Sequence, residues 1–402
     1  MPLAVLRYGR ARQYNECMNN NTQSDVPTVA ILGGGQLGAY LCQAAGPLGF
    51  RTRVLATSAP SSVDDDADYV HVGALDTVDD VMHVANGADV VTYEIESIGP
   101  ACLDALEASG IEVHPAPDVL KTLQNKVSQR AFYAAHNFPS PRWTSRDTVT
   151  TECFDALADE LGMPFVQKAA TGGYDGKGVQ VVRQPSDLRL DFGQSLFEEL
   201  VPLKNELGML VARSTTAETC AYPPVEMRFW GDNILDVAVC PAEIPKNLHE
   251  RAMQLAMDVV SALDGVGLFC LELFVDTDEQ LLTNEIAARV HNSGHLTIEG
   301  SETSQFEQHL RAISGMPLGP TTVPRPAVMK NLLSKLLPGT PGPFGAQPAH
   351  SDASATVHWY MKPDAKPLRK MGHITAVADQ VGDAIAAAES RTTQLGFTTS
   401  GE

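Results

Sequence analysis

Residues 284–295, with the sequence N-E-I-A-A-R-V-H-N-S-G-H, limit what this chain can be more than any other stretch does. An acid, a guanidinium, two imidazoles and two amides stand within twelve residues. A hydrophobic core is built from apolar side chains and does not require this mixture of polar groups. A site that handles a metal ion, a phosphate and a small anion needs such groups, so we interpret the stretch as part of one.

The segment before this stretch predicts a hairpin that carries two acids. Residues 266–275 (V-G-L-F-C-L-E-L-F-V) are typical of a strand, and residues 276–279 of a turn. If the chain folds back between Asp278 and Glu279, then Glu272 pairs with Glu285 across the hairpin. Opposed carboxylates repel each other unless something compensates. The expected compensation is Mg²⁺ bound by oxygen ligands and nucleotide phosphates, and the alternative is a solvated acidic hairpin.

Charge and length narrow the class of protein. The 49 acidic and 29 basic residues give a net charge of −20, whereas general binding to nucleic acid or to an anionic membrane needs a basic face. We therefore expect neither partner, and we expect any anionic substrate to be held by a local basic cluster. A chain of 402 residues is too long for one core, so several domains are expected.

Cysteine usage and hydropathy indicate a cytoplasmic location. The seven cysteines are scattered without a C-x-x-C motif, which is typical of reduced thiols. No apolar run approaches the roughly 18 residues of a membrane span. Residues 1–27 are expected to be a poorly ordered extension.

The first regular elements predict a doubly wound domain. A short apolar strand at residues 28–32 leads into G-G-G-Q-L-G at residues 33–38, which matches the dinucleotide fingerprint. The second strand, residues 51–55, should end near an acid for a ribose hydroxyl, yet Ala56 and Thr57 stand there. With further strands predicted at residues 89–93 and 111–113, we expect a Rossmann-like fold that does not bind NAD.

A basic helix and a glycine-rich flap follow. Residues 121–136 predict one helix with Lys126 and Arg130 on the same face, and taken alone this favours a solvated basic face. A strand at residues 164–169 carries Lys168 and is followed by T-G-G-Y-D-G-K-G and a returning strand at residues 179–182. Backbone amides of such a flap can close over phosphates. It is not a Walker A loop, because Gly178 follows Lys177.

The densest basic cluster is predicted near the end of the chain. A strand at residues 196–201, a helix at residues 247–263 and a proline- and glycine-rich linker at residues 337–348 precede it. Residues 356–375 then form two strands around the turn P-D-A-K-P. Together these strands carry the following polar residues: His358, Tyr360, Lys362, Arg369, Lys370 and His373.

Taken together, these stretches resemble the ATP-grasp ligases, and within them the branch that carboxylates aminoimidazole ribonucleotide in purine biosynthesis. The resemblance covers residues 29–376 and rests on six motifs in family order. They are G-G-G-Q-L-G, V-T-Y-E-I-E (91–96), G-G-Y-D-G-K-G (172–178), the stretch at 284–295, Q-F-E-Q-H-L-R-A-I (305–313) and R-K-M-G-H-I (369–374).

The resemblance implies an α/β architecture with the ATP-grasp fold. It implies an N-terminal Rossmann-like doubly wound domain (28–125), a small α+β lid (126–198), a catalytic subdomain (199–335) and a C-terminal β-rich cap (336–402). It also implies a homodimer that uses ATP, Mg²⁺ and bicarbonate. In that reaction bicarbonate is phosphorylated to carboxyphosphate, and the nucleotide's amine is then carboxylated.

The resemblance also assigns roles to individual residues. Phosphates would be bound by Lys126 and Lys168, adenine by Glu198 and the backbone near Glu199 and Val201, ribose by Glu206, and magnesium by Glu272 and Glu285. The remaining ATP contacts would be Gly173, Gly176 and Asn284. The acceptor nucleotide and bicarbonate would be bound by Tyr174, Asp175, Arg289, His291, Asn292, Lys362, Arg369 and Lys370. Of these, Asp175, Arg289 and His291 would be catalytic.

The sequence departs from the family's pattern in places and leaves two rival functions. The family usually has prolines where Ala288 and Val290 stand, which predicts a looser loop, and an acid near Ala56. One rival is another ATP-grasp member, such as formate-dependent glycinamide ribonucleotide formyltransferase. The other is a catalytically silent nucleotide-binding subunit, and the retention of Lys168, Glu285 and His291 argues against it.

Overall fold

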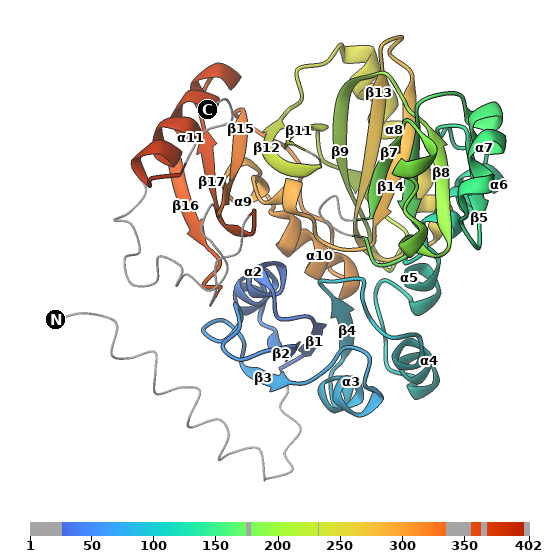
Figure 1. Ribbon diagram of the computed structural model, residues 1–402. Coiled ribbons are helices and arrows are strands. Elements are labelled where there is room, and N and C mark those ends of the chain that lie inside the picture. The colour runs from blue at the N-terminus through green and yellow to red at the C-terminus, as the bar shows by residue number, and fades with distance from the viewer. Residues whose placement is uncertain (1–25, 174–177, 232, 335–354, 363–367, 398–402) are drawn as a thin grey trace. The chain divides into compact units, whose positions relative to one another are not determined.

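The computed structural model describes residues 26–173, 178–231, 233–334, 355–362 and 368–397. The chain divides into two compact units between Val113 and His114 (Figure 1). The predicted linker and nearly all of the predicted N-terminal extension lie outside the described residues, and the finer domain boundaries stay a prediction. Among the helices of the described ranges, none is both long and apolar enough to cross a membrane.

The small unit is built on a parallel sheet, as the alternating strand and helix pattern predicts. The described strands lie in the order β3-β2-β1-β4, and the central strand β1 is buried along almost its whole length. The predicted strand at residues 111–113 is wrong, because only a single bridge joins Val113 to Val91. The elements are β1 (Thr28–Leu32), α2 (Gln36–Ala45), η2 (Gly46–Leu48), β2 (Arg51–Ala56), β3 (Tyr69–Val72), α3 (Val78–Ala85), β4 (Val90–Tyr93) and α4 (Pro100–Ser109).

The glycine-rich loop between β1 and α2 surrounds a carboxylate of its own chain. The backbone N–H of Gly35 donates to Oε1 of Glu94 at 2.8 Å. A Cβ at Gly33 would lie 2.6 Å from the Glu94 side chain, so the lack of a side chain there admits the carboxylate. A dinucleotide pyrophosphate bound at this loop would meet a negative charge, which agrees with the expectation that the domain does not bind NAD.

The large unit contains a mostly antiparallel sheet in the order β14-β13-β9-β11-β12-β15-β17-β16, with β10 paired to β9. Helices α8 and α10 pack against β9 and β13, and α11 packs against β15 and β17. The strands are β9 (Leu203–Arg213), β10 (Thr219–Ala221), β11 (Val225–Trp230), β12 (Ile234–Cys240), β13 (Gly267–Asp276), β14 (Leu281–Ala287), β15 (Ala327–Leu333), β16 (Ala355–Trp359) and β17 (Lys370–Val377). The helices are α8 (Lys246–Leu263), η6 (Asn292–Gly294), α9 (Thr297–Gly300), α10 (Gln305–Ile313) and α11 (Val381–Gln394).

A smaller antiparallel sheet of the same unit carries the predicted flap. Its order is β5-β8-β6-β7, and Leu157, Phe165 and Phe197 are among the residues that bury its apolar face. The flap strands β6 and β7 pair as predicted. The elements are β5 (Trp143–Arg146), η3 (Thr151–Cys153), α7 (Phe154–Leu161), β6 (Phe165–Ala169), β7 (Val179–Val182), η4 (Pro185–Asp187), η5 (Leu190–Phe192) and β8 (Ser195–Glu199).

The predicted helix at residues 121–136 is two helices, α5 (Pro117–Leu123) and α6 (Lys126–Ala135). Asn125 separates them because its side chain accepts hydrogen bonds from the backbone N–H groups of Val127 and Ser128. An asparagine in that role begins a new helix instead of continuing the old one. Lys126 therefore stands in the first turn of α6, one turn before Arg130.

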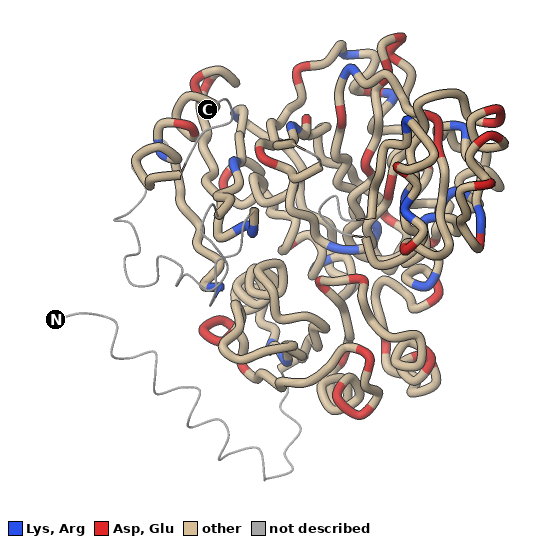
Figure 2. Tube along the Cα trace, in the orientation of Figure 1, with Lys and Arg blue, Asp and Glu red and all other residues tan. Residues whose placement is uncertain are grey.

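Acidic and basic positions are interspersed along the large unit (Figure 2). The excess of acid over base is therefore not concentrated on one element. Three cations nevertheless converge from separate elements, Lys126 and Arg130 from α6 and Lys168 from β6. Each is paired with a glutamate, Lys126 with Glu285 and the other two with Glu198.

Candidate functional site

The two carboxylates of the β13–β14 hairpin are paired as the numbering predicts. Glu272 lies opposite Glu285, while nearer the turn Leu273 lies opposite Thr283. Asn284 is therefore the extra residue of a β-bulge, which re-aims side chains and is common beside active sites. Its amide Nδ2 donates to Oε2 of Glu272 at 3.2 Å. The bulge thus adds an amide to the carboxylate pair.

A buried charged cluster connects this hairpin to the flap sheet. The ammonium of Lys168 lies 2.6 Å from Oε2 of Glu198 and donates to Oδ1 of Asn284 at 2.9 Å. Arg130 is ion-paired with Glu198 and also donates to the backbone carbonyl of Asn284. Arg130 is only 1% exposed, so the solvated basic face favoured by the sequence is wrong. An isolated buried charge is very unfavourable, and these groups neutralise one another.

Burial and charge pull the pKa values of this cluster in different directions. Burial would raise the pKa of Glu198, but Arg130 and Lys168 outweigh it and lower that pKa to about 2. Burial lowers the pKa of Lys168, and the attraction of Glu198 offsets this only in part. Glu198 is thus a permanent anion that holds the Lys168 ammonium beside the hairpin.

The hairpin carboxylates differ from each other in charge. Burial, and then the charges of Glu285 and Glu206, raise the pKa of Glu272 to about 7. Burial acts the same way on Glu285, but the ion pair with Lys126 outweighs it and leaves the pKa of Glu285 below its usual value. Within the described residues no group of three or more His, Cys, Asp or Glu is arranged so that protein side chains alone could hold a metal ion. A hard divalent cation would fit the carboxylate and amide oxygens present and would take its other oxygens from a ligand.

The loop after β14 presents His291 to the same site. Its Nε2 lies 3.5 Å from Oε1 of Glu272. Its Nδ1 accepts a hydrogen bond from the backbone N–H of Ser293 at 3.3 Å, so the proton of the neutral ring is on Nε2. Burial, followed by the charges of Arg289 and Lys370, holds the pKa of His291 well below its usual value. His291 is therefore a neutral hydrogen-bond donor that faces the carboxylates.

The C-terminal hairpin reaches this loop, because the rings of His295 and His373 stack at 4.5 Å. The charge of Lys370 acts on His291, and that of Lys362 acts on His295. Lys362 donates to the backbone carbonyl of Lys370 at 2.8 Å and lies over the ring of Tyr360. Arg369 precedes β17, and its backbone carbonyl accepts from Ser334 at 2.9 Å, a contact that ties the hairpin to the end of β15.

The remaining loop residues are held by backbone and amide contacts. Nη1 of Arg289 donates to the backbone carbonyl of Val290 at 3.1 Å. Asn292 and Asn331 exchange two hydrogen bonds through their side-chain amides, at 2.7 and 3.2 Å. Ala288 and Val290 are fully buried, so both are part of the packed interior of this unit.

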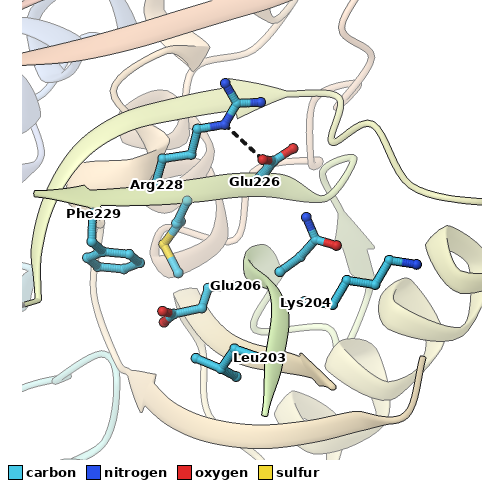
Figure 3. Close-up of a pocket in the computed structure, with 8 residues that line it drawn as sticks. Leu203, Lys204, Glu206, Glu226, Arg228 and Phe229 are labelled. Carbon is cyan, nitrogen blue, oxygen red and sulfur yellow. Dashed lines mark hydrogen bonds and ion pairs between the residues drawn. The ribbon is translucent and has the colours of Figure 1, made fainter. Parts of the chain in front are cut away.

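A pocket of about 250 Å³ lies beside Glu206 on β9. Glu206, Leu203 and Phe229 lie on one side of β11, and the ion pair of Glu226 with Arg228 lies on the other (Figure 3). Burial raises the pKa of Glu206 to about 7. A half-buried carboxyl next to apolar walls is typical of a site that orients a ligand hydroxyl.

The other predicted ATP contacts surround the same strands. The carboxylate of Glu199 accepts hydrogen bonds from the backbone N–H and the guanidinium of Arg142, at 2.8 and 2.7 Å. Val201 follows β8 and is 9% exposed. Gly173 stands at the described edge of the flap loop, whereas Tyr174, Asp175 and Gly176 lie outside the described residues.

The sequence predicts the wrong environment for Arg130 and assigns no role to Gln305 or Asn331. The signal for Arg130 was its position one turn after Lys126, on a helix that also offers the buried Gln129 to β14. The signal for Gln305 was its place at the start of the motif Q-F-E-Q-H-L-R-A-I. Asn331 gave no signal, because an amide inside an apolar strand looks like an ordinary polar interruption.

The geometry defines the class of protein: a glycine-looped flap and a carboxylate-bearing hairpin joined by a lysine cluster are the parts of an ATP-grasp enzyme. Sequence comparison agrees, because the ATP-grasp domain family matches residues 131–306. The ribonucleotide synthetase preATP-grasp domain family matches residues 26–124, and the phosphoribosylaminoimidazole carboxylase C-terminal domain family matches residues 327–387.

Similar proteins narrow the class. The chain is 40% identical over 372 residues to N5-carboxyaminoimidazole ribonucleotide synthase of Mycobacterium leprae, covering 87% of this chain and 83% of that protein. It matches the crystal structure of N5-carboxyaminoimidazole ribonucleotide synthetase from Thermotoga maritima with a TM-score of 0.81 and 35% identity, covering 91% and 98% of the two chains. The Aspergillus clavatus synthase, solved with ADP and 5-aminoimidazole ribonucleotide, matches with a TM-score of 0.80 and 29% identity over 92% and 99%. The chain belongs to the N5-carboxyaminoimidazole ribonucleotide synthase family.

Proposed function

We propose that this protein joins ATP, bicarbonate and 5-aminoimidazole ribonucleotide to give N5-carboxyaminoimidazole ribonucleotide, ADP and phosphate. A bond first forms between a bicarbonate oxygen and the γ-phosphorus of ATP while the bond to ADP breaks. The product, carboxyphosphate, then loses phosphate as its carbon is transferred to the exocyclic amine, which gives up one proton. The role of the protein in such a sequence is positioning and charge neutralisation.

The cation cluster supports the phosphate end of this assignment. Lys168 is held by Glu198 and Asn284, and Lys126 is paired with Glu285 beside it. Both ammonium groups would neutralise the charge that spreads over a transferring phosphoryl group. Glu206 and the pocket beside it would bind the ribose, and the backbone near Glu199 and Val201 would bind the adenine.

The hairpin supplies the oxygen ligands that Mg²⁺ prefers. Glu272, Glu285 and the Asn284 amide oxygen are the groups present, and burial with the charges of Glu285 and Glu206 raises the pKa of Glu272 to about 7, which a bound cation would offset. These groups would hold Mg²⁺, which would supply positive charge to neutralise the phosphates. Binding would also remove the repulsion between the two glutamates.

The loop and the C-terminal hairpin support the acceptor end. Nε2–H of His291 is placed to donate to a carboxylate or carbonate oxygen, and Arg289 adds a positive charge nearby. Lys362, Lys370 and Arg369 would bind the phosphate of the ribonucleotide, and Asn292 its polar edge. The predicted roles of Tyr174, Asp175 and Gly176 belong to the flap and complete this assignment.

One observation carries the proposal: His291 at the acceptor end lies 3.5 Å from the same Glu272 that faces the lysine cluster. The two half-reactions can therefore share one site. The test is ADP release measured with each substrate omitted in turn, together with detection of the carboxylated nucleotide. ADP release should require bicarbonate and the ribonucleotide, and release driven by formate and glycinamide ribonucleotide would instead establish the formyltransferase alternative.

We also propose that the protein is a homodimer and works in the cytoplasm. Unpaired cysteines support a reducing compartment, since all six in the described residues are free thiols. Light scattering after size exclusion measures the molar mass. A value near that of one 43.1 kDa chain would contradict the dimer.

A further inference from the structure

One side chain binds both backbone groups of His291. The N–H of His291 donates to Oε1 of Gln305 at 2.8 Å, and Nε2 of Gln305 donates to the carbonyl of His291 at 2.7 Å. Gln305 is fully buried at the start of α10. Its carboxamide therefore satisfies both the N–H and the carbonyl of this loop residue, as a neighbouring strand does inside a sheet.

Further contacts fix Gln305 itself. Its backbone N–H donates to Oγ1 of Thr297 at 2.9 Å, and the same hydroxyl donates to the carbonyl of Gly294 at 2.6 Å. The Cα of Gly294 lies directly against the Gln305 carboxamide, where a side chain would collide with it. The loop around His291 and the first turn of α10 are thus packed as one body, and neither can shift without the other.

The backbone of His291 decides where its ring lies. With the peptide groups on both sides held, the contact of Nδ1 with Ser293 fixes the orientation of the ring. Nε2–H then faces Glu272. Without the clamp, the N–H of His291 would lose its partner and its carbonyl would keep only the N–H of Gly294 at 3.0 Å, so the loop would move to satisfy the N–H. The ring would move with it.

We propose that Gln305 is a positioning residue that acts through His291 on the acceptor half of the reaction. This inference rests on the proposed function. The hydrogen bonds of Gln305 go to the backbone of His291 and to Thr297. Its contribution is to set the distance and direction of Nε2–H, and displacement of a catalytic group by about 1 Å can cost roughly a hundredfold in rate.

The same helix offers a matched control. Gln308 is also fully buried on α10 and makes the same pair of bonds to the backbone of Gly319, both at 2.8 Å. Gln308→Met removes the same carboxamide from the same environment, away from His291. Its melting temperature therefore measures how much stability is lost when such a pair of hydrogen bonds is removed away from His291.

The experiment compares Gln305→Met with Gln308→Met by melting temperature, the Michaelis constant for ATP, and carboxylated nucleotide formed per ADP released. We expect similar losses of melting temperature and Michaelis constants for ATP within about twofold of each other. Only Gln305→Met should lower carboxylation, by roughly 10- to 100-fold, and release more ADP per product. Equal coupling ratios in the two variants would overturn the inference.

A second pair covers the case in which either methionine variant does not fold. Gln305→Glu and Gln308→Glu keep the volume and one acceptor but replace the donor with an oxygen that faces a carbonyl oxygen. The same difference in coupling is expected. If the unaltered protein shows no ADP release that depends on bicarbonate and ribonucleotide, the proposed function itself has failed. If it does and the paired variants still match, only the role of Gln305 has failed.

Discussion

Around Lys168 the buried polar groups are charged and neutralise one another, whereas around His291 they are neutral amides and imidazoles that bind backbone groups. The first region holds Arg130, Glu198 and Lys168 within ion-pair distance. The second holds His291 through the Gln305 carboxamide and Ser293. Removing one member of a compensated charge cluster leaves a bare buried charge, while removing an amide leaves a misplaced group. The two regions should therefore respond differently to mutation.

The largest effect is expected from Lys168→Met. This change removes the ammonium that would meet the phosphates and leaves Glu198 with Arg130 alone, so ADP release should fall at least about a hundredfold with every combination of substrates. Steady-state ADP release measures it. The matched control is Lys330→Met, which removes a lysine that is equally buried and paired with Asp236 at 2.9 Å. A comparable loss of turnover in both variants would mean that the effect is structural.

Glu285→Gln should also lower turnover by orders of magnitude. Excess Mg²⁺ should restore more of the lost turnover in this variant than in Lys168→Met. The variant keeps the hairpin but loses one of the two carboxylates that would hold the ion. Activity is titrated against Mg²⁺ concentration. Glu279→Gln in the turn of the same hairpin, where Glu279 pairs with the exposed Lys204, serves as control. An unchanged Mg²⁺ requirement in Glu285→Gln would contradict the assignment of the ion.

Lys362→Met tests the acceptor end and should act on one substrate. A charge-assisted contact to phosphate contributes about 1.5–3 kcal/mol, so the Michaelis constant for the ribonucleotide should rise roughly ten- to a hundredfold. The constant for ATP should move little. Lys246→Met, on the exposed start of α8, controls for loss of a positive charge. A shift in the ATP constant with the ribonucleotide constant unchanged would place the C-terminal hairpin elsewhere.

The smallest effect is expected from Glu206→Gln and concerns stability. Burial raises the pKa of Glu206 to about 7 in the folded protein, against an ordinary value of 4.5. The stabilising contribution of the neutral carboxyl is complete below about pH 4.5 and is lost as the pH rises through 7. Glutamine stays neutral, so the variant should melt a few degrees higher than the unaltered protein at pH 8 and the same at pH 4.5.

Thermal unfolding at the two pH values checks this expectation. Glu226→Gln, in the same pocket but paired with Arg228, should show no gain at pH 8. If Glu206→Gln raised the melting temperature equally at both pH values, burial of the Glu206 charge would not be the cause of the increase.

The local sequence pattern predicted helices and strands well where the structure of a segment depends mainly on its own residues. The flap strands, α8 and the strands of the C-terminal hairpin follow from alternation, turns and helical period. The prediction failed at residues 111–113, because a segment of three residues forms a single bridge and not a strand. It also failed at residues 121–136, because Asn125 caps a new helix there. The predicted roles of the site residues stay predictions, including those of Tyr174 and Asp175.

The sequence by itself determined that Glu272 and Glu285 lie on neighbouring strands of one hairpin, because strand, turn and strand follow one another along the chain. Only the structure decided that they face each other, since the strands pair about Asp278 and the bulge at Asn284 then shifts the register by one residue. Only the tertiary structure decided that Arg130 is buried against Glu198, and that Gln305 holds His291. Those partners lie 68 and 14 residues apart and come from different elements. Periodicity tells which face a side chain is on, whereas the packing of separate elements decides what it meets there.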